Sequence, residues 1–248
     1  VEFILWITIF LTLPTLIIDM LNEVKKRVYL FNKSLIESSL VIQNFGNVSE
    51  KFDGKVVIKP SGINLNLHTY EDMSIIDINN GKNLSKLKPS VDEPTHRILY
   101  QNYKELNGIV HTHSNFATSF AQAKKPILNY GTTHSDFTKF PIPCTEPISE
   151  KRLNEDYEEN TGKLIIETLE RLNLRPLDIP GILVANHGVF AWGENIEIAV
   201  KNAEAIEYIA NIAFNTIFIN PSIKPIDTYI SNLHHERKHG LESYYGQE

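Results

Sequence analysis

Two histidines separated by a single residue, His111 and His113, follow the apolar run 108–110. In an extended backbone, successive side chains point to opposite faces, so residues two apart project side by side. Two neutral imidazoles that face the same way supply half of the ligands of a zinc site. A metal centre is therefore the first chemistry that this spacing indicates.

Two further residues could complete such a centre. His187 lies in an Asn-His-Gly turn after the apolar run 181–185, where a third imidazole could reach the pair. Asp92 precedes a helical pattern, and its alternative role is an N-terminal helix cap, with Pro94 in the first turn. A histidine taken alone is more often a surface residue or a hydrogen-bonded core residue, but three at strand ends favour a metal site. Because Cys144 is the single cysteine, a metal would have to use histidine and carboxylate ligands.

A second group of residues has the composition of an anion site. Residues 46–49 (Gly-Asn-Val-Ser) and 59–62 (Lys-Pro-Ser-Gly) each follow an expected strand and offer small donors and one cation. Backbone N–H groups in tight turns form concave anion sites, and a nearby lysine adds the charge. The alternative is that these are ordinary turn residues.

A third group could transfer protons. Asp136 ends the expected loop 131–136, and the C-terminal segment carries two phenols, Tyr244 and Tyr245, between glycines. A tyrosine beside a metal or an ammonium group loses its proton more easily and can act as an acid or a base. The alternative is that these aromatic residues pack for stability.

An alternation of helical and extended patterns must position these groups. Residues 21–38 carry apolar side chains at intervals of three and four, which predicts an amphipathic helix over one face of a sheet. Mixed helices and strands of this kind predict a three-layer α/β/α domain, with strand order and direction left open. The other expected strands are 40–42, 55–58, 74–78, 108–113 and 181–185, and the other expected helices are 95–106, 150–173, 196–217 and 224–239.

Composition narrows the class of protein. With 248 residues, 42% of them hydrophobic, the chain can build one large domain or two small ones, and we expect one. The net charge of -6, with lysine and arginine scattered along the chain, argues against a nucleic-acid partner. A single cysteine excludes an internal disulfide and fits a reducing compartment, so we expect a cytoplasmic protein.

Residues 1–19 do not share the pattern of the rest. The stretch 3–18 is almost entirely apolar, broken by threonines and Pro14. A membrane span needs about 20 apolar residues, and a signal peptide needs a positively charged start, whereas this segment has Glu2 and no cation before Lys25. We therefore expect residues 1–19 to be an upstream extension, with the functional domain at 20–248 and no membrane partner. An interfacial anchor or a membrane helix is the alternative.

The motifs together resemble the class II aldolase/adducin family, and within it the sugar-phosphate epimerases. The resemblance runs from residue 20 to residue 247, and ordered motifs at matched spacing over almost the whole chain are far more specific than any one of them. The segments that carry it are 46–49, 57–62, 92–96, 108–114, 131–134, 141–145, 186–188 and 237–240.

The resemblance implies a fold, a set of ligands and an assembly. The fold would be three-layer α/β/α with a central, mainly antiparallel sheet, and the protein would be a homotetramer with active sites between subunits. The metal would be zinc, although manganese, cobalt or nickel also suit such ligands. The implied metal ligands are Asp92, His111, His113 and His187; the substrate-binding residues are Asn47, Lys59, Ser61, Gly62 and Ser90; and Asp136 and Tyr245 would move protons with support from His234.

The implied activity is metal-dependent interconversion of L-ribulose 5-phosphate and D-xylulose 5-phosphate by retro-aldol and aldol steps. One alternative is a class II sugar-phosphate aldolase similar to fuculose-phosphate aldolase, in which a glutamate takes the place of Asp92. Another is an adducin-like binding module without chemistry, which the retention of all four ligand positions disfavours. One departure from the epimerase pattern is Val91, which stands where a second serine commonly follows Ser90.

Overall fold

Six strands form one antiparallel sheet in the order β3-β2-β1-β4-β6-β5. The computed structural model describes residues 2–240 and 243, with side chains described from residue 16 onward. The central pair of strands, β1 and β4, aligns Asn47 with His111, so the expected anion site and the expected metal site begin side by side. The strands are β1 (Gly46–Phe52), β2 (Lys55–Ile58), β3 (Ser74–Asp77), β4 (Gly108–Thr112), β5 (Gly181–Val184) and β6 (Gly188–Gly193).

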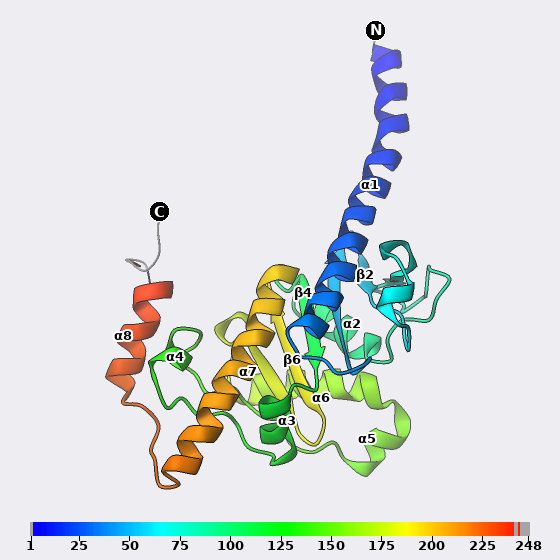
Figure 1. Ribbon diagram of the computed structural model, residues 1–248. Helices are drawn as coiled ribbons and strands as arrows, with labels where there is room; N and C mark the ends of the chain where they lie inside the picture. The colour runs from blue at the N-terminus through cyan, green and yellow to red at the C-terminus, as the bar shows by residue number, and fades with distance from the viewer. Residues whose placement is uncertain (1, 241–242, 244–248) are drawn as a thin grey trace.

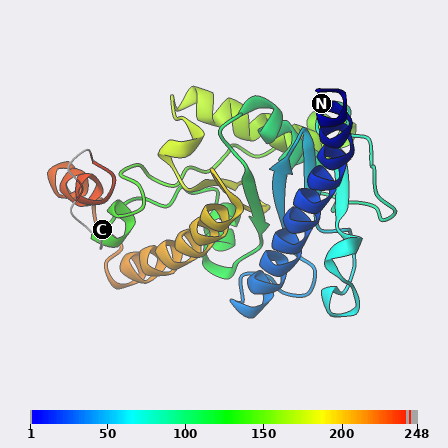
Figure 2. The same cartoon turned by 90° about the horizontal axis from the view of Figure 1, so that it is seen from above.

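Helices cover both faces of this sheet. On β4, Val110 packs into the cluster beneath α1 (Glu2–Glu37), α3 (Asn115–Gln122) and α7 (Ile196–Ile219). Its neighbour Ile109 points the other way, into the cluster beneath α2 (Glu93–Asn102) and α6 (Tyr157–Arg171). Figure 2 shows α6 along one side of the strands and α7 along the other. The three-layer α/β/α architecture is therefore confirmed.

Shorter elements complete the chain. The single-turn helix α4 (Thr132–Ser135) packs against α8 (Thr228–His239) at one end of the molecule, and α1 projects past the sheet (Figure 1). A short helix, α5 (Glu150–Glu155), precedes α6, and 3-10 turns lie at Leu65–Leu67, Tyr70–Asp72 and Pro176–Asp178. Among the residues that the structure describes, no helix combines the length and the apolar character that crossing a membrane requires.

The strand predicted at 40–42 is wrong. The backbone N–H groups of Leu40 and Val41 both donate to the carbonyl oxygen of Leu35, at 3.0 and 3.2 Å, so this segment closes the end of α1. Leu40 and Val41 are buried because they fill the core, and their apolar character reflects tertiary packing instead of sheet pairing.

Residues 46–49 form the first half of β1, so their prediction as a turn after a strand is also wrong. Asn47 and Ser49 are fully buried, and polar side chains of α2 and of the loop before it bind both of them. Gly46 has a φ of 153°, and a Cβ there would lie 2.6 Å from Val41 Cγ2 and 2.7 Å from His111 O. Glycine is therefore required where β1 meets β4.

The bounds of the other predicted strands and helices can be compared with those in the structure. Residues 55–58 form β2 as predicted, and the other expected strands agree within a residue of their ends. The helix predicted at 150–173 is two helices, because Asp156 adopts an extended backbone and its carboxylate caps α6 by accepting the N–H of Glu159 at 3.1 Å. Helix α1 starts at Glu2 and therefore extends the predicted helix 21–38, while β6, α3 and α4 were not predicted.

Candidate metal centre and active site

His111 is held in a fixed orientation by β6. Its ring stacks on Phe190, the residue opposite it in the β4–β6 pair, with 4.3 Å between ring centroids and an interplanar angle of 19°. His111 Nδ1 lies 2.9 Å from the carbonyl oxygen of Val189. Because a carbonyl only accepts, Nδ1 carries the proton, and Nε2 presents its lone pair to the site. A carbonyl that fixes the tautomer in this way is the usual support of a metal-binding histidine.

The turn between β5 and β6 brings in the third imidazole. Asn186 adopts a left-handed φ of 64°, and the N–H of His187 donates to Val184 O at 3.0 Å. Gly188 follows, and a Cβ there would lie 2.5 Å from Thr112 O and 3.3 Å from His111 Cε1. The Asn-His-Gly sequence therefore places His187 beside β4 without obstruction.

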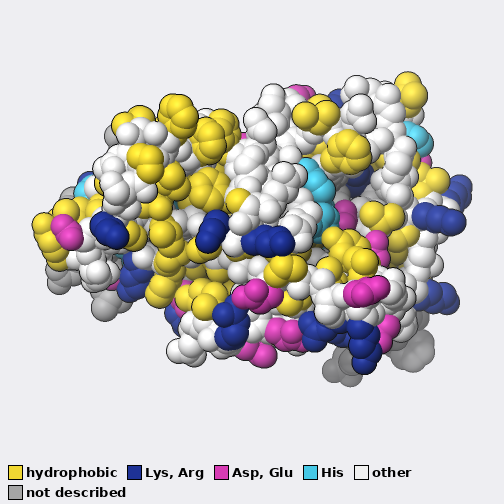
Figure 3. Space-filling model, turned by 90° about the horizontal axis from the view of Figure 1, so that it is seen from below, with side chains coloured by type: hydrophobic (Ala, Val, Ile, Leu, Met, Phe, Trp, Pro, Cys, Tyr) yellow, Lys and Arg dark blue, Asp and Glu magenta, His cyan; other side chains and the backbone are white. Residues whose placement is uncertain are grey.

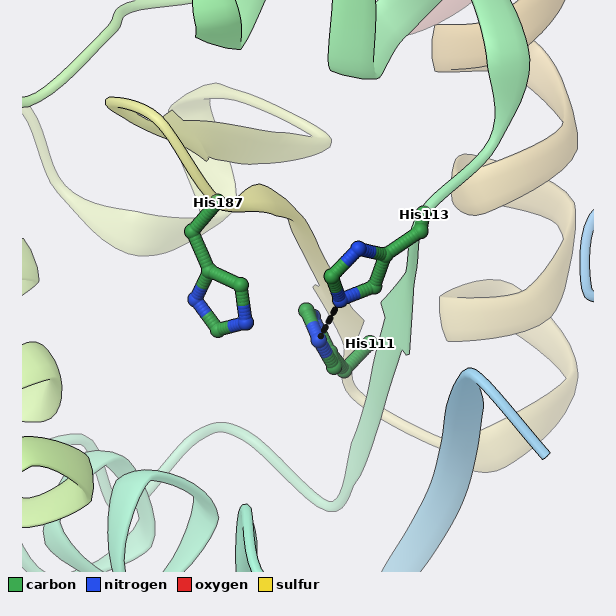
Figure 4. A group of neighbouring side chains, drawn as sticks. All are labelled: His111, His113 and His187. Carbon is green, nitrogen blue, oxygen red and sulfur yellow. Dashed lines mark hydrogen bonds between the residues drawn. The ribbon is translucent and has the colours of Figure 1, made fainter.

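The three imidazoles point toward one another (Figure 4). One ring nitrogen of each lies within 4.8 Å of those of the other two, and His111 Nε2 is 3.1 Å from His113 Nε2. Burial lowers the pKa of His187 to about 3, with the neighbouring imidazoles acting in the same direction, and burial also lowers the pKa of His113. Neutral imidazoles with converging lone pairs fit a divalent metal such as zinc.

Asp92 occupies the N-cap position of α2, but it does not act as a cap. Its side chain makes no capping hydrogen bond, and Oδ2 instead accepts Asn47 Nδ2 at 2.7 Å and Ser90 Oγ at 3.4 Å. Burial would raise the pKa of Asp92, but His111, two other histidines and Asn47 outweigh it and hold the pKa below its ordinary value. Among the described residues, the side chains whose ligand atoms converge here are the three histidines, without Asp92. Asp92 as a fourth metal ligand therefore stays a proposal.

The expected anion pocket lies beside Asp92. Lys59 is only 5% exposed, and its Nζ donates to Gly46 O at 2.6 Å and Asn44 O at 3.2 Å. Burial lowers the pKa of Lys59 to about 8, against the opposing charge of Asp92. Asn47 donates through Nδ2 to Ser90 Oγ at 3.0 Å, while its buried Oδ1 has no partner among the described residues. A substrate hydroxyl could donate the hydrogen bond that Asn47 Oδ1 lacks.

Two further predicted substrate-binding residues follow Lys59 within the same loop. Ser61 and Gly62 are exposed, and Gly62 has a φ of 67° that favours glycine. Backbone hydrogen bonds from Ser61 N to Lys88 O and from Ser90 N to Lys59 O join the two loops that carry the predicted residues. The structure thus places Lys59, Ser61, Gly62 and Ser90 on one connected pair of loops.

Asp136 and His234 come together, but not at the three histidines. The Asp136 carboxylate accepts His234 Nδ1 at 3.3 Å and Arg237 Nη2 at 3.1 Å, and Lys238 Nζ is 3.6 Å away. Burial would raise the pKa of Asp136, but Arg237 and Lys238 outweigh it and lower the pKa, so the carboxylate is charged at neutral pH. Helices α4 and α8 lie at the end of the molecule away from α2 (Figure 1). Tyr244 and Tyr245 lie outside the described residues.

Sequence reasoning missed several neighbours of the histidines. The Tyr157 ring lies 5.7 Å from that of His187, and Phe190 supports His111 from behind. The apolar run 188–193 directly after the Asn-His-Gly turn was a signal for a strand that would carry Phe190. No local signal places Tyr157, the first residue of α6, beside a turn thirty residues further along the chain.

Comparison with known proteins identifies close relatives. Residues 26–214 match the family described as Class II Aldolase and Adducin N-terminal domain. The chain is similar to the L-ribulose-5-phosphate 4-epimerase UlaF of Salmonella paratyphi B, with 44% identity over 230 residues, which is 92% of this chain and 100% of the relative. The UlaF of Salmonella typhi is similar to the same degree, at 44% identity over the same shares.

Solved structures agree on the fold. An L-fuculose 1-phosphate aldolase superposes with a TM-score of 0.73 at 24% identity, covering 87% of this chain and 95% of the aldolase. The l-fuculose-1-phosphate aldolase of Thermus thermophilus gives a TM-score of 0.60 at 18% identity, covering 80% of this chain and 96% of that aldolase. At these identities the likeness concerns the architecture, including the antiparallel central sheet.

Proposed function

The chain belongs to the class II aldolase and adducin family, and on that premise we propose that it is a metal-dependent epimerase acting on L-ribulose 5-phosphate and D-xylulose 5-phosphate. The observation that carries the proposal is the trio of neutral imidazoles, with converging ring nitrogens, at the ends of β4 and β5. The relatives at 44% identity supply the substrate class.

The residues of the site would have separate roles in the reaction. A divalent metal, held by His111, His113, His187 and Asp92, would supply Lewis-acid stabilisation of the negative charge that develops on the substrate. Lys59, with Asn47 and Ser90 beside it, would bind the phosphate and hydroxyl groups through charge-assisted hydrogen bonds. Ser61 and Gly62 would donate from the edge of the pocket.

Proton transfer would fall to Asp136 and Tyr245, with His234 orienting Asp136. One of them removes the proton of the 4-hydroxyl, the bond between carbons 3 and 4 breaks, and its electrons move to the carbonyl oxygen at carbon 2. The released glycolaldehyde phosphate rotates, and the same carbon 3 attacks its other face. The second group then returns a proton to the new alkoxide, so that only the configuration at carbon 4 changes.

We further propose a homotetramer with active sites between subunits, located in the cytoplasm, with zinc as the metal. Two features support the assembly. The Asp136–His234 pair lies apart from its own chain's histidines, and an apolar groove of about 640 Å³ runs between α3 and α7. Many hydrophobic side chains lie on the face shown in Figure 3. Within the groove, Phe214 and Phe218 are exposed in the single chain.

An assay on the purified chain tests the proposal against its alternative. L-ribulose 5-phosphate is supplied with zinc or manganese, and D-xylulose 5-phosphate is measured. Metal-dependent product supports the epimerase. Cleavage of L-fuculose 1-phosphate without epimerisation would favour the aldolase.

Val91 offers a test of the phosphate pocket. Its side chain is 63% exposed beside Ser90, where a serine could donate one more hydrogen bond to a phosphate. A hydrogen bond to a charged group is worth roughly 1.5 kcal/mol or more, so we expect Val91→Ser to lower KM by about tenfold with kcat unchanged. Val91→Thr is the matched variant that adds the hydroxyl at nearly constant volume. An unchanged KM in both would place the phosphate elsewhere.

Lys59 predicts a pH dependence of substrate binding. Its pKa of about 8 means that the ammonium is present at pH 7 and is progressively lost above pH 8. We therefore expect KM to rise between about pH 7.5 and about pH 9.5, by roughly tenfold per unit above the pKa for a single essential proton. The Lys59→Arg variant, which stays charged throughout this range, should lose this dependence even if its KM is higher. A KM that climbs equally in both proteins would assign the titration to another group.

A further inference from the structure

His113 is the least constrained of the three histidines. His111 is locked by Val189 and Phe190, whereas His113 is exposed and its Nδ1 has no hydrogen-bond partner among the described residues. Its Nε2 contacts only His111 Nε2, and its ring otherwise approaches Phe45 and His187 at centroid distances of 6.3 and 5.0 Å. The position of this imidazole therefore depends on the backbone that carries it.

That backbone is anchored from another helix. Helix α3 begins two residues after His113, and Ser114, at its N-cap position, makes no capping hydrogen bond. Glu207 of α7 takes over this role: Oε1 accepts the N–H of Phe116 and Oε2 accepts the N–H of Ala117, each at 2.9 Å. A carboxylate that binds two free N–H groups in the first turn of a helix stabilises that end through hydrogen bonds and through the helix dipole.

We propose that Glu207 is a positioning residue of the metal centre. By fixing the first turn of α3 against α7, its carboxylate holds the backbone of His113 at the place from which the imidazole reaches the other two ring nitrogens. The inference rests on the proposed function in that it takes the three histidines as metal ligands. Glu207 itself binds backbone N–H groups and touches none of these histidines.

The first experiment measures zinc affinity by competition with a chromophoric chelator in the absence of substrate. We expect Glu207→Ala to weaken zinc binding by about tenfold, which is the lower range for loss of a supporting hydrogen bond around a metal ligand. Glu207→Gln keeps one acceptor and should lose less. Glu204 lies one turn earlier on α7, is exposed and bonds no described side chain or backbone group, so Glu204→Gln removes the same charge and should bind zinc normally.

Two comparisons separate positioning from general loosening of the fold. Leu169→Ala opens a cavity beneath α6, in the core on the other face of the sheet, and should lower Tm without changing zinc affinity. The weak zinc binding that remains in a His113→Ala chain, measured with a large excess of metal, should not weaken further when Glu207→Ala is added, because the effect of Glu207 acts through that imidazole. Wild-type affinity in both Glu207 variants, an equal loss in Leu169→Ala, or a full additional loss without His113 would each overturn the inference. Failure of the epimerase assay would refute the proposed function and leave this affinity test unaffected.

Discussion

Replacing His111 by alanine is expected to remove the metal and to lower epimerase turnover by on the order of 10³-fold or more. The metal would stabilise the developing negative charge by several kcal/mol, and about 1.4 kcal/mol corresponds to tenfold in rate. Among the three histidines, His111 has the best-defined Nε2 lone pair, because Val189 O holds the proton on Nδ1. Metal content per chain and the rate of D-xylulose 5-phosphate formation are the two measurements.

The stacking of His111 on Phe190 requires a control for packing. His113→Ala removes an exposed ligand with little loss of packing and should reproduce the loss of metal and turnover, whereas Tm should fall mainly in His111→Ala. His68, which pairs with Asp72 away from the site, provides a matched histidine whose replacement should leave metal content at the wild-type value. Retention of metal and turnover by both ligand variants would refute the site.

Local sequence patterns predicted a strand correctly where the apolar residues of the strand itself account for its burial. Residues 56–58 are apolar, and together with Lys55 they form β2 as predicted. The pattern failed at β1, whose Asn47 and Ser49 are buried only because Asp92 and His96 bind them from segments more than forty residues later in the sequence. Residues 40–42 show the converse error, since Leu40 and Val41 serve core packing at the end of a helix and Ile42 is exposed.

The same distinction applies to the site. The i, i+2 spacing of His111 and His113 on an extended segment predicts their proximity directly, and the turn after β5 explains His187. Pairing of Asp136 with His234, 98 residues apart, was accessible only through resemblance to a family. Glu207 lies on the helix that packs across the sheet, and its bonds to Phe116 and Ala117 span about ninety residues, so no sequence pattern marks it.

Asp136→Asn is expected to lower turnover by about 10² to 10⁴-fold while leaving zinc content unchanged. The charged neighbours of Asp136 keep its pKa low, so the carboxylate is ionised at neutral pH and free to accept a proton, whereas an amide cannot accept one. Glu167→Gln is the matched control, because Arg152 binds that carboxylate in a similar way at 2.7 Å on the exposed side of α6. Equal loss in the two variants would point to stability instead of catalysis.

Mixing two inactive variants decides where Asp136 acts. If each site combines the histidines of one subunit with the Asp136 of its neighbour, a tetramer formed from equal amounts of His111→Ala and Asp136→Asn chains contains sites with both native residues. Random assembly gives about a quarter of the sites this composition, so turnover should return to about a quarter of the wild-type rate. A site built within one chain would gain nothing from mixing, because every chain would carry one of the two defects. Recovered turnover would thus explain why the structure separates Asp136 from the histidines of its own chain.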